Sequence, residues 1–273
     1  MVGIEVLLNL QKFECNSSQL KTIKLPNLKN VQVHLQSNSS LEHIDLTALD
    51  SLSNLFISNS ILLNSLDLKD LSSLKSLNVY RTSINNLDFK NATSLENLSL
   101  QHNNINELDV SYNPKLVSLK IREANLKKLD ISKNTKISNL EFGGMSTTPY
   151  NYVVYKSPIS TIDLSNNTEL TSLIFNYTEI RTVDLSKNPN IKDIDCSNNL
   201  LETIDLSKNK KITNLNCSNN KLKSLDISNS PNLLHLDCTN NPIEIVYVNK
   251  EFNIGNPLPS YKIPPNAIFK VKE

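Results

Sequence analysis

Apolar and polar positions alternate along the chain in a pattern that recurs at a nearly fixed interval. If the second apolar residue of each Leu-x-x-Leu-x-Leu stretch is the anchor, the steps are 21 or 22 residues, apart from one step of 33. The anchors are Leu55, Leu77, Leu98, Leu119, Leu140, Leu173, Ile194, Leu215 and Leu236, with Phe13 and Val31 as two earlier, irregular members. A second series with the same steps lies between them: Ile44, Leu66, Leu87, Leu108, Leu129, Ile162, Val183, Ile204, Leu225 and Val246. A 12-residue insertion into a 21-residue repeat explains why both series jump at the same place.

Each repeat contains a short stretch with the pattern of a β-strand. In residues 191–211, apolar side chains at positions 1, 4, 6 and 11 point inward, and the middle of this stretch alternates with a period of two. One turn alone cannot bury its leucines, but identical turns stacked in register share a continuous core. The second half of the repeat is too short for a full helix. The pattern therefore predicts a mainly β solenoid of ~21-residue turns with parallel strands and little or no helix.

The pattern also carries a family resemblance. Ile191-x-x-Ile194-x-Cys196-x-x-Asn199-x-Leu201 matches L-x-x-L-x-L-x-x-N/C-x-L, so the chain from about residue 10 to 248 resembles the leucine-rich repeat family. Its alternating half-repeats are similar to the short-repeat, Bacteroidetes-like type of bacterial surface protein, which is related to internalins. The resemblance implies a right-handed coil whose concave face carries the strands and serves as the recognition surface. It also implies an extracellular or cell-surface location.

Three segments are expected. Residues 25–248 form the solenoid, with the 12-residue insertion within 143–158, and residues 249–273 form a C-terminal cap. Residues 1–24 are interpreted as an irregular first turn or a cap remnant. Residues 1–12 lack the charged and apolar regions of a signal peptide. Either the first turn caps itself, or an export signal or lipoprotein anchor lies further upstream, which we expect because related surface proteins carry one.

Asparagine recurs in two columns. At position 9, where the chain bends away from the strand, an Asn amide can donate and accept and so satisfy buried backbone groups. Ser and Thr are weaker substitutes and Ala or Met cannot substitute, so the N-terminal half is expected to be less regular. This column reads Ser18, Ser60, Thr82, Asn103, Ala124, Met145, Thr178, Asn199, Asn220 and Asn241. The second half of the repeat has its own column: Asn113, Asn134, Asn167, Asn188 and Asn209.

A column of aspartates faces outward from the second half-repeats: Asp45, Asp67, Asp88, Asp109, Asp130, Asp163, Asp184, Asp205 and Asp226. Neighbours ~5 Å apart would repel by roughly 0.8 kcal/mol per pair even in water, so the charges must be compensated. We interpret each carboxylate as an acceptor for backbone N–H or Ser hydroxyl groups near its turn, assisted by nearby Lys. A calcium ladder is the alternative, but no Gly-containing calcium loop is visible.

The four cysteines all occupy position 6 of the first half: Cys15, Cys196, Cys217 and Cys238. We interpret them as small, inward-facing apolar residues. A zinc site is the alternative, but thiols stacked in a row do not converge tetrahedrally. No metal or cofactor is therefore expected.

Composition and charge narrow the function. Lys and Arg total 28 and Asp and Glu total 27, so the net charge of +1 gives no electrostatic footprint for nucleic acid. No uninterrupted apolar stretch approaches the ~18–20 residues of a membrane helix, so no membrane insertion is expected. The sequence holds no Gly-rich phosphate loop, no H-E-x-x-H and no G-x-S-x-G, and its His residues lie in different turns. We therefore predict no catalytic residues and no enzymatic activity.

The outward positions of the strand face vary, and their aromatic and Arg residues concentrate between Phe56 and Tyr177, on the strands that flank the Tyr-rich insertion. Tyr and Arg are enriched in interface hot spots. We therefore predict a recognition or adhesion module that binds a protein or a glycan through the concave strand face and the insertion. A structural spacer within a larger cell-surface protein is the alternative. The predicted partner-binding residues are Phe56, Tyr80, Arg81, His102, Arg122, Glu123, Glu141, Tyr150, Tyr152, Tyr155, Asn176 and Tyr177.

Overall fold

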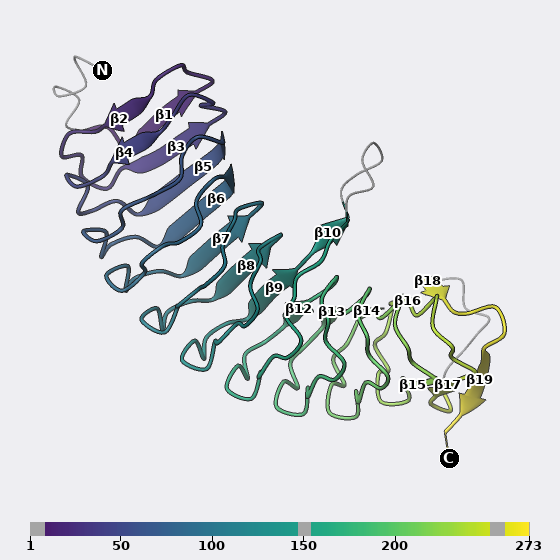
Figure 1. Ribbon diagram of the computed structural model, residues 1–273. Coiled ribbons are helices and arrows are strands. Elements are labelled where there is room, and N and C mark those ends of the chain that lie inside the picture. The colour runs from purple at the N-terminus through teal and green to yellow at the C-terminus, as the bar shows by residue number, and fades with distance from the viewer. Residues whose placement is uncertain (1–8, 147–153, 252–259, 273) are drawn as a thin grey trace. The chain divides into compact units, whose positions relative to one another are not determined.

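The structure, a computed structural model, describes residues 9–146, 154–251 and 260–272. The chain divides into two compact units, residues 1–136 and 137–273. Each unit is a stack of similar turns (Figure 1). The described residues form strands, turns and bends but no helix, which confirms the predicted mainly β solenoid. Accordingly, this part of the chain contains no helix long and apolar enough to cross a membrane.

The strands of the first unit are β1 (Lys12–Asn16), β2 (Thr22–Lys24), β3 (Gln32–Gln36), β4 (His43–Asp45), β5 (Asn54–Ser60), β6 (Ser76–Thr82), β7 (Asn97–Gln101) and β8 (Ser118–Arg122). Those of the second unit are β9 (Asn139–Gly143), β10 (Met145–Ser146), β11 (Val154–Tyr155), β12 (Ser172–Ile174), β13 (Asp193–Asp195), β14 (Asn214–Asn216), β15 (Ser224–Asp226), β16 (His235–Asp237), β17 (Ile245–Val248), β18 (Ser260–Lys262) and β19 (Ile268–Val271).

The predicted anchors stack directly on one another. In the first unit, β1, β3, β5, β6, β7 and β8 pair in parallel in that order, and in the second unit β9, β12, β13, β14, β16 and β18 do the same. The paired anchors are Leu55, Leu77, Leu98 and Leu119 in one row, and Leu140, Leu173, Ile194, Leu215 and Leu236 in the other. These anchors are buried, and each Leu contributes about 2 kcal/mol of hydrophobic stabilisation.

The anchor of the second turn was predicted wrongly. Val33, and not Val31, lies opposite Phe13. Both valines are fully buried because they alternate along one buried face, so hydrophobicity alone could not choose between the two registers. The correct register places Asn38 at position 9, where its Nδ2 donates to the Cys15 carbonyl at 2.7 Å.

The position-9 asparagines join each bend to the preceding turn, as predicted. Asn199 Oδ1 accepts the backbone N–H of Thr178 at 3.1 Å, while its Nδ2 donates to the carbonyls of Phe175 at 2.8 Å and Cys196 at 3.1 Å. One and two turns further on, Asn220 and Asn241 donate in the same way to the Cys196 and Cys217 carbonyls, and their Oδ1 atoms accept the N–H groups of Leu201 and Leu222. Where Thr178 replaces Asn, its hydroxyl also donates to Asn199.

The second asparagine column is fully buried on the other side of the turn. Asn188 Nδ2, for example, donates to the carbonyls of Leu164 at 3.1 Å and Asn167 at 2.9 Å. Each such side chain therefore links its own turn to the one before it, in place of the backbone ladder that a helix or sheet provides.

The insertion begins as a short hairpin in which β10 and β11 pair antiparallel. It leaves the strand row at Gly143 and Gly144, where little space is available. A Cβ on Gly144 would lie 1.6 Å from the Tyr155 carbonyl oxygen, and Gly143 has a φ of 116°. The chain rejoins the solenoid where the Ser157 N–H donates to the Tyr177 carbonyl at 2.9 Å. Only glycine fits this exit from the row.

At the end of the second unit, β18 extends the row through β16, and β19 extends the row formed by β15 and β17. Tyr261 donates its hydroxyl to the Leu233 carbonyl at 2.7 Å, which fastens β18 to the preceding turn.

Candidate functional site

In most turns the residue at position 8, near the end of the strand or in the bend that follows it, adopts a left-handed backbone conformation. Its φ lies between 51° and 56° at Ser17, Ser37, Asn59, Arg81, His102, Glu123, Tyr177, Asn198, Asn219 and Asn240. Asn adopts this conformation more readily than most residues. For side chains such as Arg, Glu and Tyr, it costs on the order of 1 kcal/mol of conformational free energy. Asn198, Asn219 and Asn240 show that the bend itself does not require a large residue. Four predicted partner-binding residues occupy it nonetheless: Arg81, His102, Glu123 and Tyr177.

Three of the predicted residues are in contact: Tyr80 on β6, His102 just after β7 and Glu123 just after β8. The ring of Tyr80 packs edge-on against His102, with centroids 4.8 Å apart and an interplanar angle of 77°. His102 Nδ1 lies 2.6 Å from Glu123 Oε2. These side chains are 21 or 22 residues apart in the sequence, and the stacking of turns brings them into contact. We call Tyr80, Arg81, His102, Arg122 and Glu123 the aromatic–charged patch.

Burial sets the protonation of this patch. The side chain of Glu123 is only 4% exposed, and its burial raises the pKa of its carboxyl. Burial also lowers the pKa of His102, and the positive charges of Arg81 and Arg122 lower it further. Both shifts favour the neutral form of the two side chains over the charged form. Glu123 Oε1 is buried and has no hydrogen-bond partner in the described part of the chain.

The other predicted residues are distributed differently. Phe56 on β5 packs against His34, with centroids 5.8 Å apart, and is not part of the patch. In the second unit, Asn176 is buried and donates to Asp195 Oδ2 at 3.3 Å. Glu141 on β9 is half-buried, opposite Ile174 of β12.

The aromatic residues of the insertion are only partly described. Tyr155 is 46% exposed, whereas Tyr150 and Tyr152 lie outside the described residues. Tyr177 and Lys156 line a hollow of about 390 Å³ in the second unit. The insertion therefore borders a cavity, although its predicted role in binding stays a prediction.

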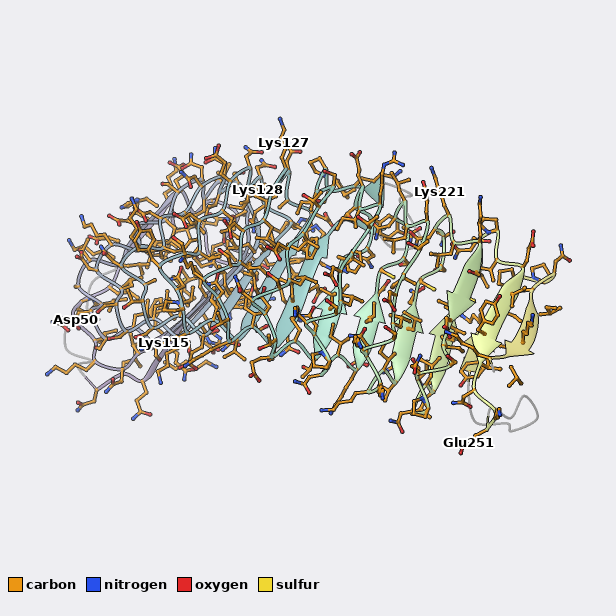
Figure 2. The ribbon with its side chains drawn as sticks, turned by 90° about the horizontal axis from the view of Figure 1, so that it is seen from below. Asp50, Lys115, Lys127, Lys128, Lys221 and Glu251 are labelled. Atoms are coloured by element: carbon orange, nitrogen blue, oxygen red, sulfur yellow. The ribbon has the colours of Figure 1, made fainter. Side chains whose placement is uncertain are left out.

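Exposed charged side chains lie along both edges of the first unit. In the first unit, Lys127 and Lys128 lie along one edge, and Asp50 and Lys115 lie along the opposite edge (Figure 2). These exposed side chains offer matched positions for control substitutions.

The aspartate column is structural in the way that was predicted. Asp184 Oδ1 accepts the N–H of Ser186 at 2.9 Å, and the same bond from the residue two positions on is made by all nine aspartates. These bonds lower the pKa of Asp109, Asp130, Asp184 and Asp205. Within the described residues, no group of three or more His, Cys, Asp or Glu side chains is arranged to hold a metal ion.

The cysteines are thiols rather than disulfides. Cys196, Cys217 and Cys238 are buried, as predicted, and burial raises the pKa of each, to about 12 for Cys238. Cys15 is only half-buried because it lies on β1, the first strand of its row.

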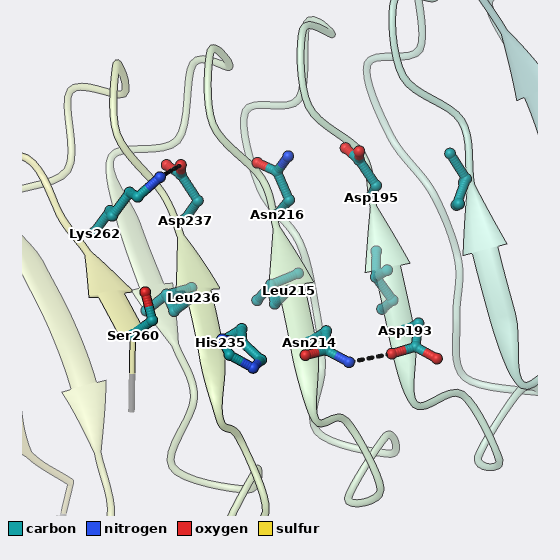
Figure 3. Close-up of a pocket in the computed structure, with 12 residues that line it drawn as sticks. Asp193, Asp195, Asn214, Leu215, Asn216, His235, Leu236, Asp237, Ser260 and Lys262 are labelled. Atoms are coloured by element: carbon teal, nitrogen blue, oxygen red, sulfur yellow. Dashed lines mark hydrogen bonds and ion pairs between the residues drawn. The ribbon is translucent and has the colours of Figure 1, made fainter. Parts of the chain in front are cut away.

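A second hollow, which was not predicted from the sequence, lies on the strand face of β13, β14, β16 and β18. It has a volume of about 350 Å³, and its walls include Asp193, Asp195, Asn214 and Asn216 (Figure 3). Small, similar side chains of this kind gave no hint of a binding surface. One sequence feature could have indicated this hollow. The strand Asp-Ile-Asp is followed, at the same positions of the next repeat, by the strand Asn-Leu-Asn.

Comparison with known proteins finds similarity at the level of structure. No family model and no curated protein matches the sequence. The functional domain of InlJ from Listeria monocytogenes, which includes a cysteine ladder, is 25% identical and superposes with a TM-score of 0.64. The match covers 83% of this chain and 49% of that one, so this chain spans about half the length of that structure.

Two further structures have the same fold. The internalin InlF from Listeria monocytogenes is 16% identical, with a TM-score of 0.61, and the match covers 97% of this chain and 87% of that one. The plant peptide hormone receptor RGFR1, in complex with RGF2, is 16% identical, with a TM-score of 0.59 and coverages of 89% and 48%. The 21-residue repeat, the parallel solenoid that it forms and these similarities show that the chain has the leucine-rich repeat fold.

Proposed function

We propose that this protein is a non-enzymatic recognition module that binds a partner protein through the aromatic–charged patch. The observation that carries the proposal is the choice of residue at position 8. Arg81, His102 and Glu123 adopt a left-handed backbone where Asn serves elsewhere in the chain. Stability alone favours Asn at such positions. Residues kept in an unfavourable conformation are concentrated at functional sites, which supports a role in binding.

The chemistry of the patch suits a protein surface. Tyr80 and Arg122 are half-buried and Arg81 is exposed, so a ring and guanidinium donors lie beside each other. Tyr and Arg are the residue types that contribute most at interface hot spots. The 2.6 Å contact between His102 Nδ1 and Glu123 Oε2 holds the imidazole against the Tyr80 ring, which lowers the entropy lost when the ring is covered by a partner.

Binding can be tested with a variant whose sequence is taken from a neighbouring turn. Ser58 and Asn59 on β5 are the counterparts of Tyr80 and Arg81 on β6. The double variant Y80S/R81N therefore copies a turn that already folds in this protein. Wild type, this variant and the edge variant K115A/K127A are compared on protein and glycan arrays, and the hits are then measured by biolayer interferometry.

We expect wild type and the edge variant to bind the same protein, and Y80S/R81N to bind it at least about 10-fold more weakly, since a hot-spot residue contributes ~2 kcal/mol. Equal binding by Y80S/R81N would refute the patch as the site. Hits confined to glycans would favour a glycan ligand, and no hits at all would favour the spacer.

We also propose that the module works outside the cell or at its surface. The resemblance of its half-repeats to those of bacterial surface proteins supports this location. Mass spectrometry of the mature protein from fractionated cells tests it, and recovery of the uncleaved protein from the cytoplasm alone would contradict it.

A further inference from the structure

The hollow on the strand face of the second unit is a groove between two rows of polar side chains. One row contains Asp193, Asn214 and His235, and the other contains Asp195, Asn216 and Asp237 (Figure 3). Both rows stand on the same outer face of β13, β14 and β16, two residues apart along each strand, because residues i and i+2 of a strand share a face. The groove therefore crosses the strands at ~4.8 Å per step.

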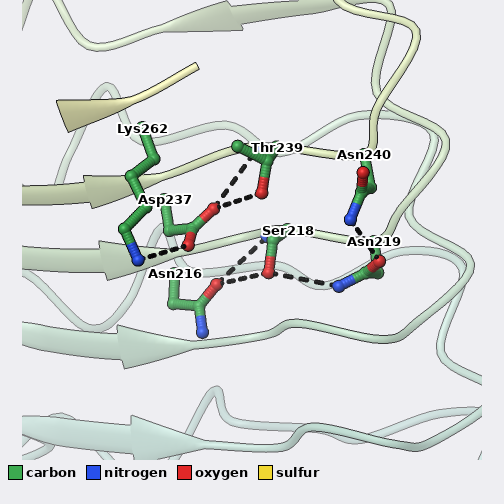
Figure 4. Close-up of polar contacts among 7 residues, drawn as sticks. All are labelled: Asn216, Ser218, Asn219, Asp237, Thr239, Asn240 and Lys262. Atoms are coloured by element: carbon green, nitrogen blue, oxygen red, sulfur yellow. Dashed lines mark hydrogen bonds and ion pairs between the residues drawn. The ribbon is translucent and has the colours of Figure 1, made fainter. Parts of the chain in front are cut away.

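The charges along this groove are unequal. At the end formed by β18, the Asp237 carboxylate accepts bonds from Thr239 and is 3.6 Å from Lys262 Nζ (Figure 4). At the β13 end, Asp193 accepts a bond from Asn214, and Asp195 accepts bonds from the Ser197 N–H and Asn176.

Neither Asp193 nor Asp195 forms an ion pair within the described part of the chain. By contrast, Asp226 and Asp237 of the same unit form ion pairs with Lys272 and Lys262. Asp193 and Asp195 are thus two half-buried carboxylates on one short strand without an ion-pair partner among the described residues, at the edge of a hollow of about 350 Å³.

We propose that this groove binds an arginine-containing, extended segment of a partner protein, with the guanidinium between Asp193 and Asp195. Residues i and i+2 of a strand are ~7 Å apart, so a guanidinium between them has a carboxylate on each side. Its planar fork donates to both, which the single ammonium group of Lys does less well. The amides of Asn214 and Asn216 on the next strand supply donors and acceptors for the backbone of the same segment. This surface is separate from the aromatic–charged patch.

The chain provides its own template for the test variant. The counterparts of Asp193 and Asp195 on β14 are Asn214 and Asn216, and Asn216 accepts the N–H of Ser218 just as Asp195 accepts that of Ser197 (Figure 4). D193N/D195N therefore removes two charges and keeps the turn. The control D184N/D205N removes the same charge from the opposite side of the repeat.

The probe is an N-acetylated, C-amidated peptide of glycine and serine with one central arginine, and its counterpart contains citrulline, which has the same shape without the charge. Binding is followed by ¹H–¹⁵N NMR titration of the full chain. We expect saturable shifts at the β13 and β14 amides, with affinity at least about 10-fold weaker for citrulline or for D193N/D195N. Higher salt should weaken binding because the pair is partly exposed.

Three results would overturn the proposal: equal binding of the citrulline peptide, an equal loss in D184N/D205N, or no saturable shift up to about 10 mM peptide, the weak limit of a specific contact. The Y80S/R81N variant should bind the peptide as wild type does, so the two surfaces succeed or fail independently.

Discussion

Replacing Asn199 with Ala tests whether the position-9 asparagines, here called the asparagine ladder, hold the turns together. Asn199 is 6% exposed, and its amide bonds Thr178 of the preceding turn as well as the carbonyls of Phe175 and Cys196. Ala removes these bonds and leaves the backbone groups without partners. At ~1 kcal/mol per buried hydrogen bond, we expect N199A to lose about 3 kcal/mol of unfolding free energy, after some relief from water entering the bend.

The loss is measured by urea unfolding followed by circular dichroism. Because repeat proteins can unfold in more than one step, amide exchange at Thr178 identifies the transition of the second unit. The control is N190A, since Asn190 is only half-buried and both of its side-chain bonds, to the Thr168 carbonyl at 3.4 Å and from Lys211 Nζ at 2.7 Å, lie at the exposed surface. The control should change stability by less than about 0.5 kcal/mol. A loss below about 1 kcal/mol for N199A, or an equal loss for N190A, would refute the structural role of the ladder.

Three further predictions follow from the same contacts. Because burial raises the pKa of Glu123, its ionisation costs stability in the folded state, so the stability of E123Q relative to wild type should increase as pH rises from 4.5 towards 7; urea unfolding at several pH values checks this, and a constant difference would contradict it. G144A should speed amide exchange at Ser157, since its Cβ collides with the Tyr155 carbonyl; unchanged exchange would show that the hairpin adapts. With maleimide under native conditions, Cys15 should react while Cys217 stays unlabelled by mass spectrometry; rapid labelling of Cys217 would show that the core opens.

Part of the candidate site could be predicted from the sequence. The concentration of Tyr, Arg and His at outward positions marked Tyr80, Arg81, His102 and Glu123 as partner-binding candidates, and the structure brings three of them into contact. The backbone strain at Arg81, His102 and Glu123 could not be predicted, since the left-handed φ at position 8 is a property of the folded bend. Phe56, which shares the same composition signal, lies against His34 instead.

The sequence by itself determined the features that every turn repeats: the buried anchors, the asparagine ladder, the aspartate turns and the absence of helix from the described residues. Each depends on residue types within one or two repeats, so periodicity was enough. Only the tertiary structure decided the register at Val33, the meeting of Tyr80 with His102 and the charge imbalance at Asp193. These depend on which side chains face each other across turns. That geometry is set by the stacking of the backbone, and alternating hydrophobicity fits more than one such stacking.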